Sequence, residues 1–176
     1  MSVVRHIPPE GPETSSVFVI GLGDLEDPAV KLGAEHWQRL KGDRRFPARD
    51  ELTPRDMAPF LRNIALVRVI DGGRDYEYRI AGDAHVEAHG ATFQGTCLSD
   101  LEARAPRYGR LTRATYEHVR VTAEPYCLRG WVGRDVPDSR FVYYESAFLT
   151  LGANGDAVDH LMIVSAYMPR SGAIGR

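Results

Sequence analysis

The stretch NIALVRVIDGGRDYEYRIAG, residues 63–82, decides the fold of this chain. Its first half is rich in Val and Ile, which favour β-strands. The Asp-Gly-Gly sequence at 71–73 is a strong turn signal. In the second half Tyr76, Tyr78 and Ile80 alternate, which places them on one face of a strand. The stretch therefore predicts an antiparallel hairpin with strands at residues 63–70 and 74–81.

Two helices are expected before this hairpin. The first covers residues 27–41, because Asp27 suits the N-cap and Pro28 the first helical position, and a glycine follows its end. The second is short and runs from Thr53 to about Leu61, with the threonine as its cap.

A helical region and three more strands are expected after the hairpin. Residues 83–90 suit a short helix ended by a glycine, and residues 106–121 suit a longer one opened by a proline. The loop between them contains a helical turn near Leu98–Leu101. Three strand-like runs follow, separated by turn residues, at 125–133, 140–151 and 157–168.

This order of elements predicts an α+β fold. Its sheet is expected to be antiparallel and five-stranded, with helices on one face, plus the N-terminal helix. A pocket between the sheet and its helical layer is the expected ligand site. We expect a flexible arm at residues 1–26, a folded domain at 27–170 and a tail at 171–176. Within the arm, the apolar run from Val17 to Ile20 fits a short strand or an extended segment that packs elsewhere on the protein.

Composition and charge exclude several classes of function. Hydrophobic residues make up 43% and charged residues 26% of the 176, and the net charge is -2, so nucleic acid is not an expected partner. No apolar run approaches the ~20 residues that span a bilayer. The N-terminus lacks the apolar region of a secretory signal, and Cys97 and Cys127 form no CxxC pair. Reduced thiols in a cytoplasmic protein are therefore expected.

The motif order resembles a family of single-domain PAS proteins found mainly in alphaproteobacteria. The resemblance covers residues 33–168. It rests on a Trp-containing helix followed by RFPARD (45–50), LTP (52–54), the first strand, YRIAG (78–82) and GTCLSDL (95–101). It implies a PAS fold whose first strands lie centrally in the sheet. It also implies a sensor in bacterial signal transduction, not an enzyme, that acts through small-molecule sensing or protein–protein interaction.

Two alternatives stay open beside the sensor. One is a small-molecule carrier or an enzyme with a PAS-like fold, and the other is a purely structural dimerisation adaptor. No catalytic residue is nominated, because the Asp, Glu, Ser and His residues are too scattered to suggest a catalytic set. A cavity with convergent polar groups would favour sensing, a filled core would favour the adaptor, and perturbed acid–base groups in a cleft would favour an enzyme.

The expected ligand pocket lies between the last three strands and the helices around residues 83–121. Its predicted lining residues are Tyr78, Ile80, Val86, Leu98, Leu111, His118 and Met162. On the longer helix Leu111, Ala114, His118 and Val121 follow a 3-4-3 spacing and are expected to share one side.

Neither a cofactor nor a metal is expected. His85 and His89 are spaced as i and i+4 in HVEAH, but the zincin pattern places Glu directly after the first histidine, so we interpret them as a surface pair. Cys97 lacks the sequence context of flavin-binding cysteines. Haem-binding PAS domains often take an axial histidine from the corresponding helix, so haem ligation by His118 is the alternative.

A homodimer held partly by the N-terminal helix is expected. Val30, Ala34, Trp37 and Leu40 form an apolar stripe that must be buried somewhere. The predicted interface residues are Val30, Trp37 and Leu40, with the tryptophan as anchor. The alternative is that this stripe packs on its own sheet in a monomer. A signalling protein is the other expected partner.

Overall fold

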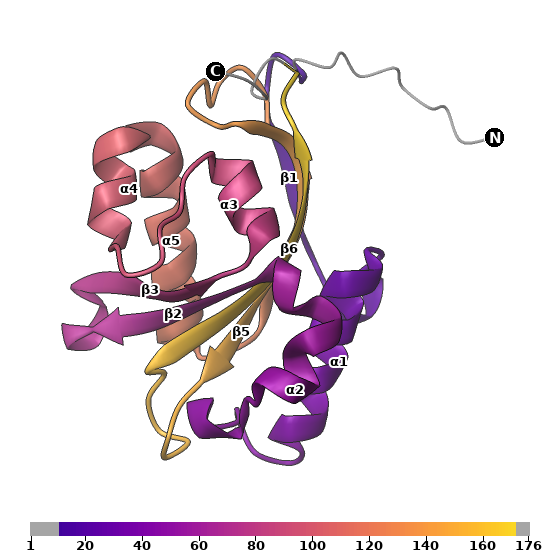
Figure 1. Ribbon diagram of the computed structural model, residues 1–176, viewed down its shortest axis with the longest axis vertical. Helices are drawn as coiled ribbons and strands as arrows, with labels where there is room; N and C mark the ends of the chain where they lie inside the picture. Colours follow the sequence, from indigo (N-terminus) through magenta and orange to yellow (C-terminus); the bar gives the residue numbers. More distant parts are fainter. Residues whose placement is uncertain (1–10, 172–176) are drawn as a thin grey trace.

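The computed structural model describes residues 11–171 and has helices on both sides of one antiparallel sheet (Figure 1). The six strands lie in the order β1-β4-β5-β6-β2-β3. Their bounds are β1 Ser16–Ile20, β2 Ile64–Ile70, β3 Asp75–Ala81, β4 Tyr126–Trp131, β5 Phe141–Leu151 and β6 His160–Pro169. The α+β class and the antiparallel sheet are confirmed, with one strand more than expected. Residues 172–176 of the expected tail lie outside the described residues.

Helices occupy the segments between the strands. The α-helices are α1 Pro28–Lys41, α2 Pro54–Met57, α3 Asp83–His89, α4 Leu98–Arg104 and α5 Pro106–Thr122. Short 3-10 helices are η1 Leu22–Asp24, η2 Arg49–Glu51, η3 Ala58–Asn63 and η4 Asp71–Gly73. Figure 1 shows α3, α4 and α5 on one side of the sheet, with α1 and α2 on the other. We call these the α5 face and the α1 face.

The additional strand, β1, comes from the segment expected to be a flexible arm. Its residues pair with β4 in register from Ser16↔Trp131 to Ile20↔Cys127. Just before it, the Ser15 hydroxyl donates to Asp135 Oδ1 at 2.7 Å. The expected arm is therefore wrong for residues 11–26, which belong to the folded domain because their backbone groups are paired. Residues 1–10 lie outside the described residues.

The order of the hairpin strands in the sheet differs partly from the expectation. β2 lies inside the sheet between β6 and β3, as the resemblance implies, whereas β3 forms an edge. The last three strands form the predicted meander, because β4 pairs with β5 and β5 with β6.

Helix α1 packs closely on the sheet. The Trp37 indole donates from Nε1 to the carbonyl oxygen of Thr150 at 2.8 Å. Gly33 permits the close approach, because a Cβ at this position would lie 2.6 Å from a methyl carbon of Val164 on β6. Burial of a large aromatic ring together with its polar group makes this contact a main stabiliser of the fold.

The predicted dimer stripe on α1 is buried within the chain itself. Val30 is 0% and Trp37 1% exposed, and Leu40 packs half-buried against the same core. These three residues therefore cannot form an interface between two copies of this fold. The alternative, in which the stripe packs on its own sheet, describes the structure.

A β-bulge decides which side chains of the hairpin reach the α5 face. Ile80 pairs with Leu66 and Tyr78 pairs with Val67, so Arg79 is an additional residue on β3. Leu66 and Val67 are consecutive residues of β2, so their side chains point to opposite faces of the sheet. Each paired residue of β3 shares the face of its partner, so Tyr78 and Ile80 also point to opposite faces. Tyr78 lies on the α5 face, and Ile80 lies on the α1 face. The prediction that both share one face is wrong.

Candidate functional site

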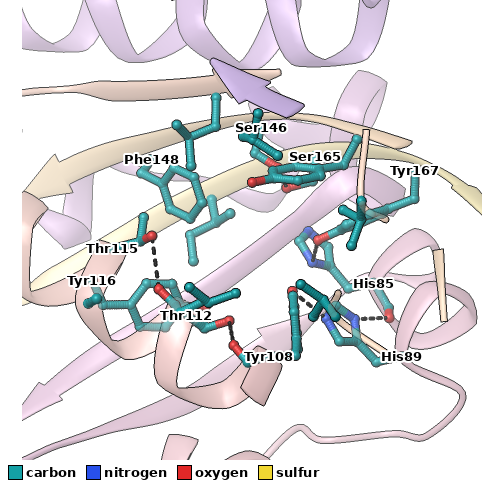
Figure 2. A pocket seen from close by; sticks show the side chains of 18 of the residues that line it. His85, His89, Tyr108, Thr112, Thr115, Tyr116, Ser146, Phe148, Ser165 and Tyr167 are labelled. Carbon is teal, nitrogen blue, oxygen red and sulfur yellow. Dashed lines mark hydrogen bonds between the residues drawn. The ribbon is translucent and has the colours of Figure 1, made fainter. Parts of the chain in front are cut away.

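A cavity of about 660 Å³ lies between the α5 face of the sheet and helices α3 and α5 (Figure 2). This volume is within the range of small-molecule sites. Strands β4, β5 and β6 supply alternate residues to its wall, namely Tyr126, Leu128, Tyr144, Ser146, Phe148, Ile163, Ser165 and Tyr167. Two histidines of α3 and several residues of α5 complete it. Most of these side chains are aromatic or carry a hydroxyl group.

His85 is held in one tautomer by its two neighbours. Its Nε2 atom lies 2.8 Å from the carbonyl oxygen of Asn63, and a carbonyl only accepts, so Nε2 carries the proton. The Nδ1 atom then accepts from the hydroxyl of Tyr167 at 3.1 Å. Both ring nitrogens are thus occupied, and the Tyr167 proton is used in the bond to His85.

His89 has the opposite tautomer for the same reason. Its Nδ1 atom donates to the carbonyl oxygen of His85 at 2.8 Å. Its Nε2 atom therefore accepts from the hydroxyl of Tyr108 at 3.0 Å. We call His85, His89, Tyr108 and Tyr167 the His–Tyr network. The expected surface pair of histidines is wrong, because α3 turns both rings toward the sheet.

Burial keeps the His–Tyr network uncharged. It lowers the pKa of His85 to about 3 and that of His89 to about 4. It also raises the pKa of Tyr108 to about 12 and that of Tyr167 well above its ordinary value. At neutral pH the four side chains are therefore neutral.

Two hydroxyl pairs line the remaining wall. Tyr78 and Tyr116 lie with their hydroxyl oxygens 3.1 Å apart, and Ser146 and Ser165 lie 2.6 Å apart. The tyrosine pair uses one of its two protons in the mutual bond, so one proton is left. In the serine pair, Ser165 also donates to the hydroxyl oxygen of Tyr167, so both protons are used. Burial raises the pKa of both tyrosines of the first pair, which keeps their protons in place at neutral pH.

Charged side chains line the cavity only at its rim. The residues that line it include one arginine, Arg107, which is exposed, and one carboxylate, that of Asp135. Asp135 accepts from both the backbone N–H and the hydroxyl of Ser15, at 2.8 and 2.7 Å. These bonds hold the segment before β1 against the cavity, where Ser15 and Val17 contribute to the wall.

Helix α5 presents a partly exposed side to the cavity. Leu111, Ala114 and His118 line it, as their spacing predicts, yet Leu111 is 52% exposed. Val121, expected on the same side, is 64% exposed and does not line the cavity. The His118 ring lies at the rim, 4.7 Å from the ring of Tyr126.

Three of the predicted lining residues reach the cavity, namely Tyr78, Leu111 and His118. Ile80 lies on the α1 face because of the bulge in β3. Met162 lies on the same face because it pairs with Leu66, whose side chain also points to the α1 face. Leu98 is fully buried in the core, and Val86 is half-buried on α3 away from the cavity. These four assignments are corrected.

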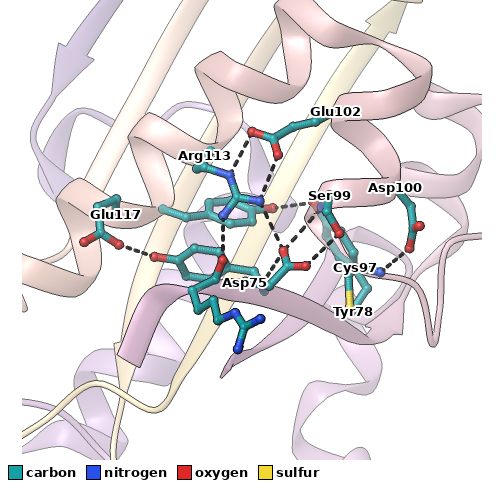
Figure 3. A network of polar contacts seen from close by, with 11 residues as sticks. Asp75, Tyr78, Cys97, Ser99, Asp100, Glu102, Arg113 and Glu117 are labelled. Atoms are coloured by element: carbon teal, nitrogen blue, oxygen red, sulfur yellow. Dashed lines mark hydrogen bonds and ion pairs between the residues drawn. The ribbon is translucent and has the colours of Figure 1, made fainter. Parts of the chain in front are cut away.

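A network of ion pairs holds the elements beside the cavity together (Figure 3). Arg113 of α5 donates to both carboxylate oxygens of Glu102 on α4, at 2.8 and 2.9 Å. It also donates to Asp75 of β3 at 3.2 Å, and Asp75 accepts from the Ser99 hydroxyl at 2.7 Å. One guanidinium thereby connects α4 with β3 and α5, and the latter two supply residues to the cavity wall.

The described residues contain no group of three or more His, Cys, Asp or Glu side chains that could hold a metal ion. In residues 11–171, no helix has the length and apolar character needed to cross a membrane. Cys97 lies outside the cavity lining, and burial together with nearby carboxylates raises the pKa of its thiol.

Comparison with known families identifies the class of protein to which this fold and cavity belong. The PAS domain model matches residues 26–129, which is more than half of the chain. The chain therefore belongs to the PAS domain family, whose members are in general sensory or signalling modules. No curated protein and no solved structure matches the chain.

Sequence reasoning did not find most of the cavity. It passed over His85, His89, Tyr108, Tyr116, Tyr144, Ser146, Ser165 and Tyr167 as lining residues. A usable signal was the alternation of tyrosine and serine in the last strands, at 144–146 and 165–167. Polar side chains at alternate positions of otherwise apolar internal strands must face either a polar cavity or each other.

Proposed function

We propose that this protein is a sensory or regulatory module of bacterial signalling that binds an uncharged small molecule in the cavity and passes the signal to a protein partner. The observation that carries the proposal is the His–Tyr network. It places fixed hydrogen-bonding groups in a cavity of about 660 Å³ instead of filling that space with apolar side chains. Convergent polar groups in a mostly aromatic cavity are typical of ligand sites.

This arrangement supports binding over catalysis. A general base needs a free lone pair that reaches the substrate. In His85 and His89 one nitrogen donates to a carbonyl and the other accepts from a tyrosine. The serine pair is hydrogen-bonded within itself, at 2.6 Å, and not to a histidine. We therefore propose a non-enzymatic role without a bound cofactor, and a cytoplasmic location in keeping with the free thiols of Cys97 and Cys127.

The experiment compares two tryptophan substitutions on exposed alanines. Ala114 lines the cavity from α5, whereas Ala103 on α4 does not. Native mass spectrometry of the purified protein should detect a retained small molecule, and Ala114→Trp should remove it while Ala103→Trp keeps it. Both variants should remain folded by circular dichroism. If no molecule is retained, a broad small-molecule thermal-shift screen is the second readout. Failure of every compound to stabilise the wild type would reject the proposal.

We also propose that the protein forms a homodimer through β1 instead of α1. One edge of β1 pairs with β4, and no other strand of the described chain pairs with its outer edge. Val17, Phe18 and Val19 are 37%, 64% and 61% exposed. An unprotected apolar edge strand readily pairs with another strand. Antiparallel pairing of two copies about Phe18 would place Val17 opposite Val19, with no charged residue in the strand.

The dimer is tested by sedimentation at several concentrations. Phe18→Asp should convert dimer to monomer, whereas the matched change Leu32→Asp, at another exposed apolar position on α1, should leave the dimer intact. A monomeric wild type at high concentration, or equal effects of the two substitutions, would refute the role of β1.

A further inference from the structure

The walls of the cavity point to a particular chemical class of ligand. We infer that the cavity takes an uncharged aromatic molecule with a hydroxyl group and a carbonyl group at separate positions. This inference rests on the proposed function, since it specifies what that site binds.

The absence of charge in the ligand follows from the absence of charged groups at the inner end of the cavity. The groups there are tyrosines, serines and two neutral histidines, and the ionised Arg107 and Asp135 lie at the rim. An ionised carboxylate or ammonium group would lose its hydration without gaining a partner of opposite charge, which disfavours binding. A neutral group of the same shape avoids this cost.

The aromatic character of the ligand follows from the arrangement of the aromatic rings in the cavity wall. Tyr78 and Phe93 meet edge to face at 4.9 Å between ring centroids, and His89 and Phe93 do so at 5.0 Å. Tyr116 meets Tyr78 edge to face at 6.4 Å, and Phe148 lies 6.1 Å from Tyr116. A planar ring inserted among these rings gains further contacts of the same kind, which aromatic pairs favour beyond simple burial.

The positions of the hydroxyl protons distinguish donor from acceptor sites. Tyr108 and Tyr167 use their protons on histidine nitrogens, so toward a ligand their oxygens can only accept. The oxygen of Tyr167 also accepts from the Ser165 hydroxyl, which leaves it one lone pair for a ligand hydroxyl. The Tyr78–Tyr116 pair has one proton left, which suits a ligand carbonyl. Figure 2 shows Tyr116 and Tyr167 on opposite sides of the cavity, so the two ligand groups must be separated by the ring.

Three bicyclic probes with one naphthalene ring test the charge and the hydroxyl site. The first is 6-hydroxy-2-acetonaphthone, the second is 6-hydroxy-2-naphthoate, in which a carboxylate replaces the methyl ketone, and the third is the 6-methoxy ether of the first. Calorimetry at pH 7 should show that the hydroxyketone binds at least tenfold more tightly than the carboxylate. A 12-carbon alcohol serves as an uncharged probe without a ring, and it should also bind at least tenfold more weakly.

The hydroxyl site is tested with Tyr167→Phe and its control Tyr143→Phe, which lies on the α1 face. Tyr167→Phe should weaken binding of the hydroxyketone by about threefold to tenfold, the range of one hydrogen bond. It should leave the methoxy ether unaffected, because an ether has no proton to donate. A general distortion of the cavity would weaken both probes equally.

Failure of this inference is separate from failure of the proposed function. The inference is overturned if the carboxylate or the 12-carbon alcohol binds as tightly as the hydroxyketone, or if Tyr167→Phe weakens both naphthyl ketones equally. In those cases the cavity still binds a small molecule and the sensory role stands. If none of the probes binds, no compound of a broader screen stabilises the protein and no molecule is retained on purification, both proposals fail.

Discussion

His89 accepts a hydrogen bond from the hydroxyl of Tyr108, with 3.0 Å between Nε2 and the oxygen, across the gap between α3 and α5. The bond exists because the other ring nitrogen donates to the carbonyl oxygen of His85, one turn earlier in the same helix. A short helix thus fixes a tautomer, and the tautomer fixes the direction of a tyrosine proton. Four predictions test the structural features on which the cavity and the fold depend.

The first prediction concerns Tyr108→Phe. The substitution leaves Nε2 of His89 without its donor in a place with little access to water, which should lower the free energy of unfolding by about 1–2 kcal/mol. Urea denaturation followed by circular dichroism measures it. Tyr143→Phe, on the α1 face, is the control and should change stability by less than about 0.5 kcal/mol. Equal stability of Tyr108→Phe and wild type would contradict the bond.

The second prediction is a loss of stability in mild acid. Burial lowers the pKa of His85 to about 3 and of His89 to about 4, and it also lowers that of His36. Below pH 6.5 the unfolded chain binds protons that the folded protein does not, so stability is complete above pH 6.5 and falls as the pH decreases toward 4. Each imidazole contributes at most about 1.4 kcal/mol per pH unit.

The measurement for this second prediction compares urea denaturation at pH 7.5 and pH 5.5. This interval lies above the range in which Glu51 and Glu117, whose pKa values are lowered to about 2 chiefly by their arginine partners, lose their charge. His89→Asn should make the dependence shallower, because it removes one of the imidazoles whose pKa burial lowers. Identical stability of the wild type at both pH values would show that the imidazoles are not buried as described.

The third prediction separates the two roles considered for Trp37. Its side chain is 1% exposed and donates to Thr150, so Trp37→Ala should lower the free energy of unfolding by about 3–5 kcal/mol. The loss should be the same at all protein concentrations, because the residue supports the chain's own core. Leu32→Ala, on the exposed side of α1, should cost little. A Trp37→Ala variant of unchanged stability that only dissociates a dimer would reverse this conclusion.

The fourth prediction concerns the carboxylate of Glu145. It is 2% exposed, accepts from the backbone N–H groups of Glu26 and Asp27 at 2.9 and 2.8 Å, and lies 3.2 Å from Arg129. Glu145→Ala removes the acceptor for the start of α1 and leaves the arginine without this partner, which should cost about 3 kcal/mol. Hydrogen exchange should then increase first in residues 26–30. The control is Glu124→Ala at an exposed position. Unchanged exchange in this segment would mean that α1 is anchored by other contacts.

The sequence predicted the helices and strands well because their signals are local. Asp27 accepts from the N–H groups of Ala29 and Val30 at 2.9 and 3.2 Å, as an N-cap should, so the start of α1 could be located from three neighbouring residues. The turn at 71–73 and the β-rich runs beside it gave the hairpin in the same way. The motif order also identified the PAS family, which the family comparison supports.

The faces of the strands could not be predicted to the same extent. One additional residue, Arg79, turns Ile80 to the α1 face, and no local signal marks that bulge. Met162 and Ile163 are both apolar and both buried, so alternation could not indicate which of them faces the cavity. The predicted interface on α1 failed for a similar reason, because an apolar stripe shows that a surface is buried but not by what.

By itself the sequence determined the order of elements, the caps and turns, and the family, since these depend on residues close together in the chain. Only the tertiary structure decided that β1 joins the sheet and that His85 and His89 face inward. It also decided that their tautomers direct the protons of Tyr167 and Tyr108. These features depend on contacts between residues 19 to 120 positions apart. Such contacts form only when strand register, the bulge and helix packing are all satisfied together.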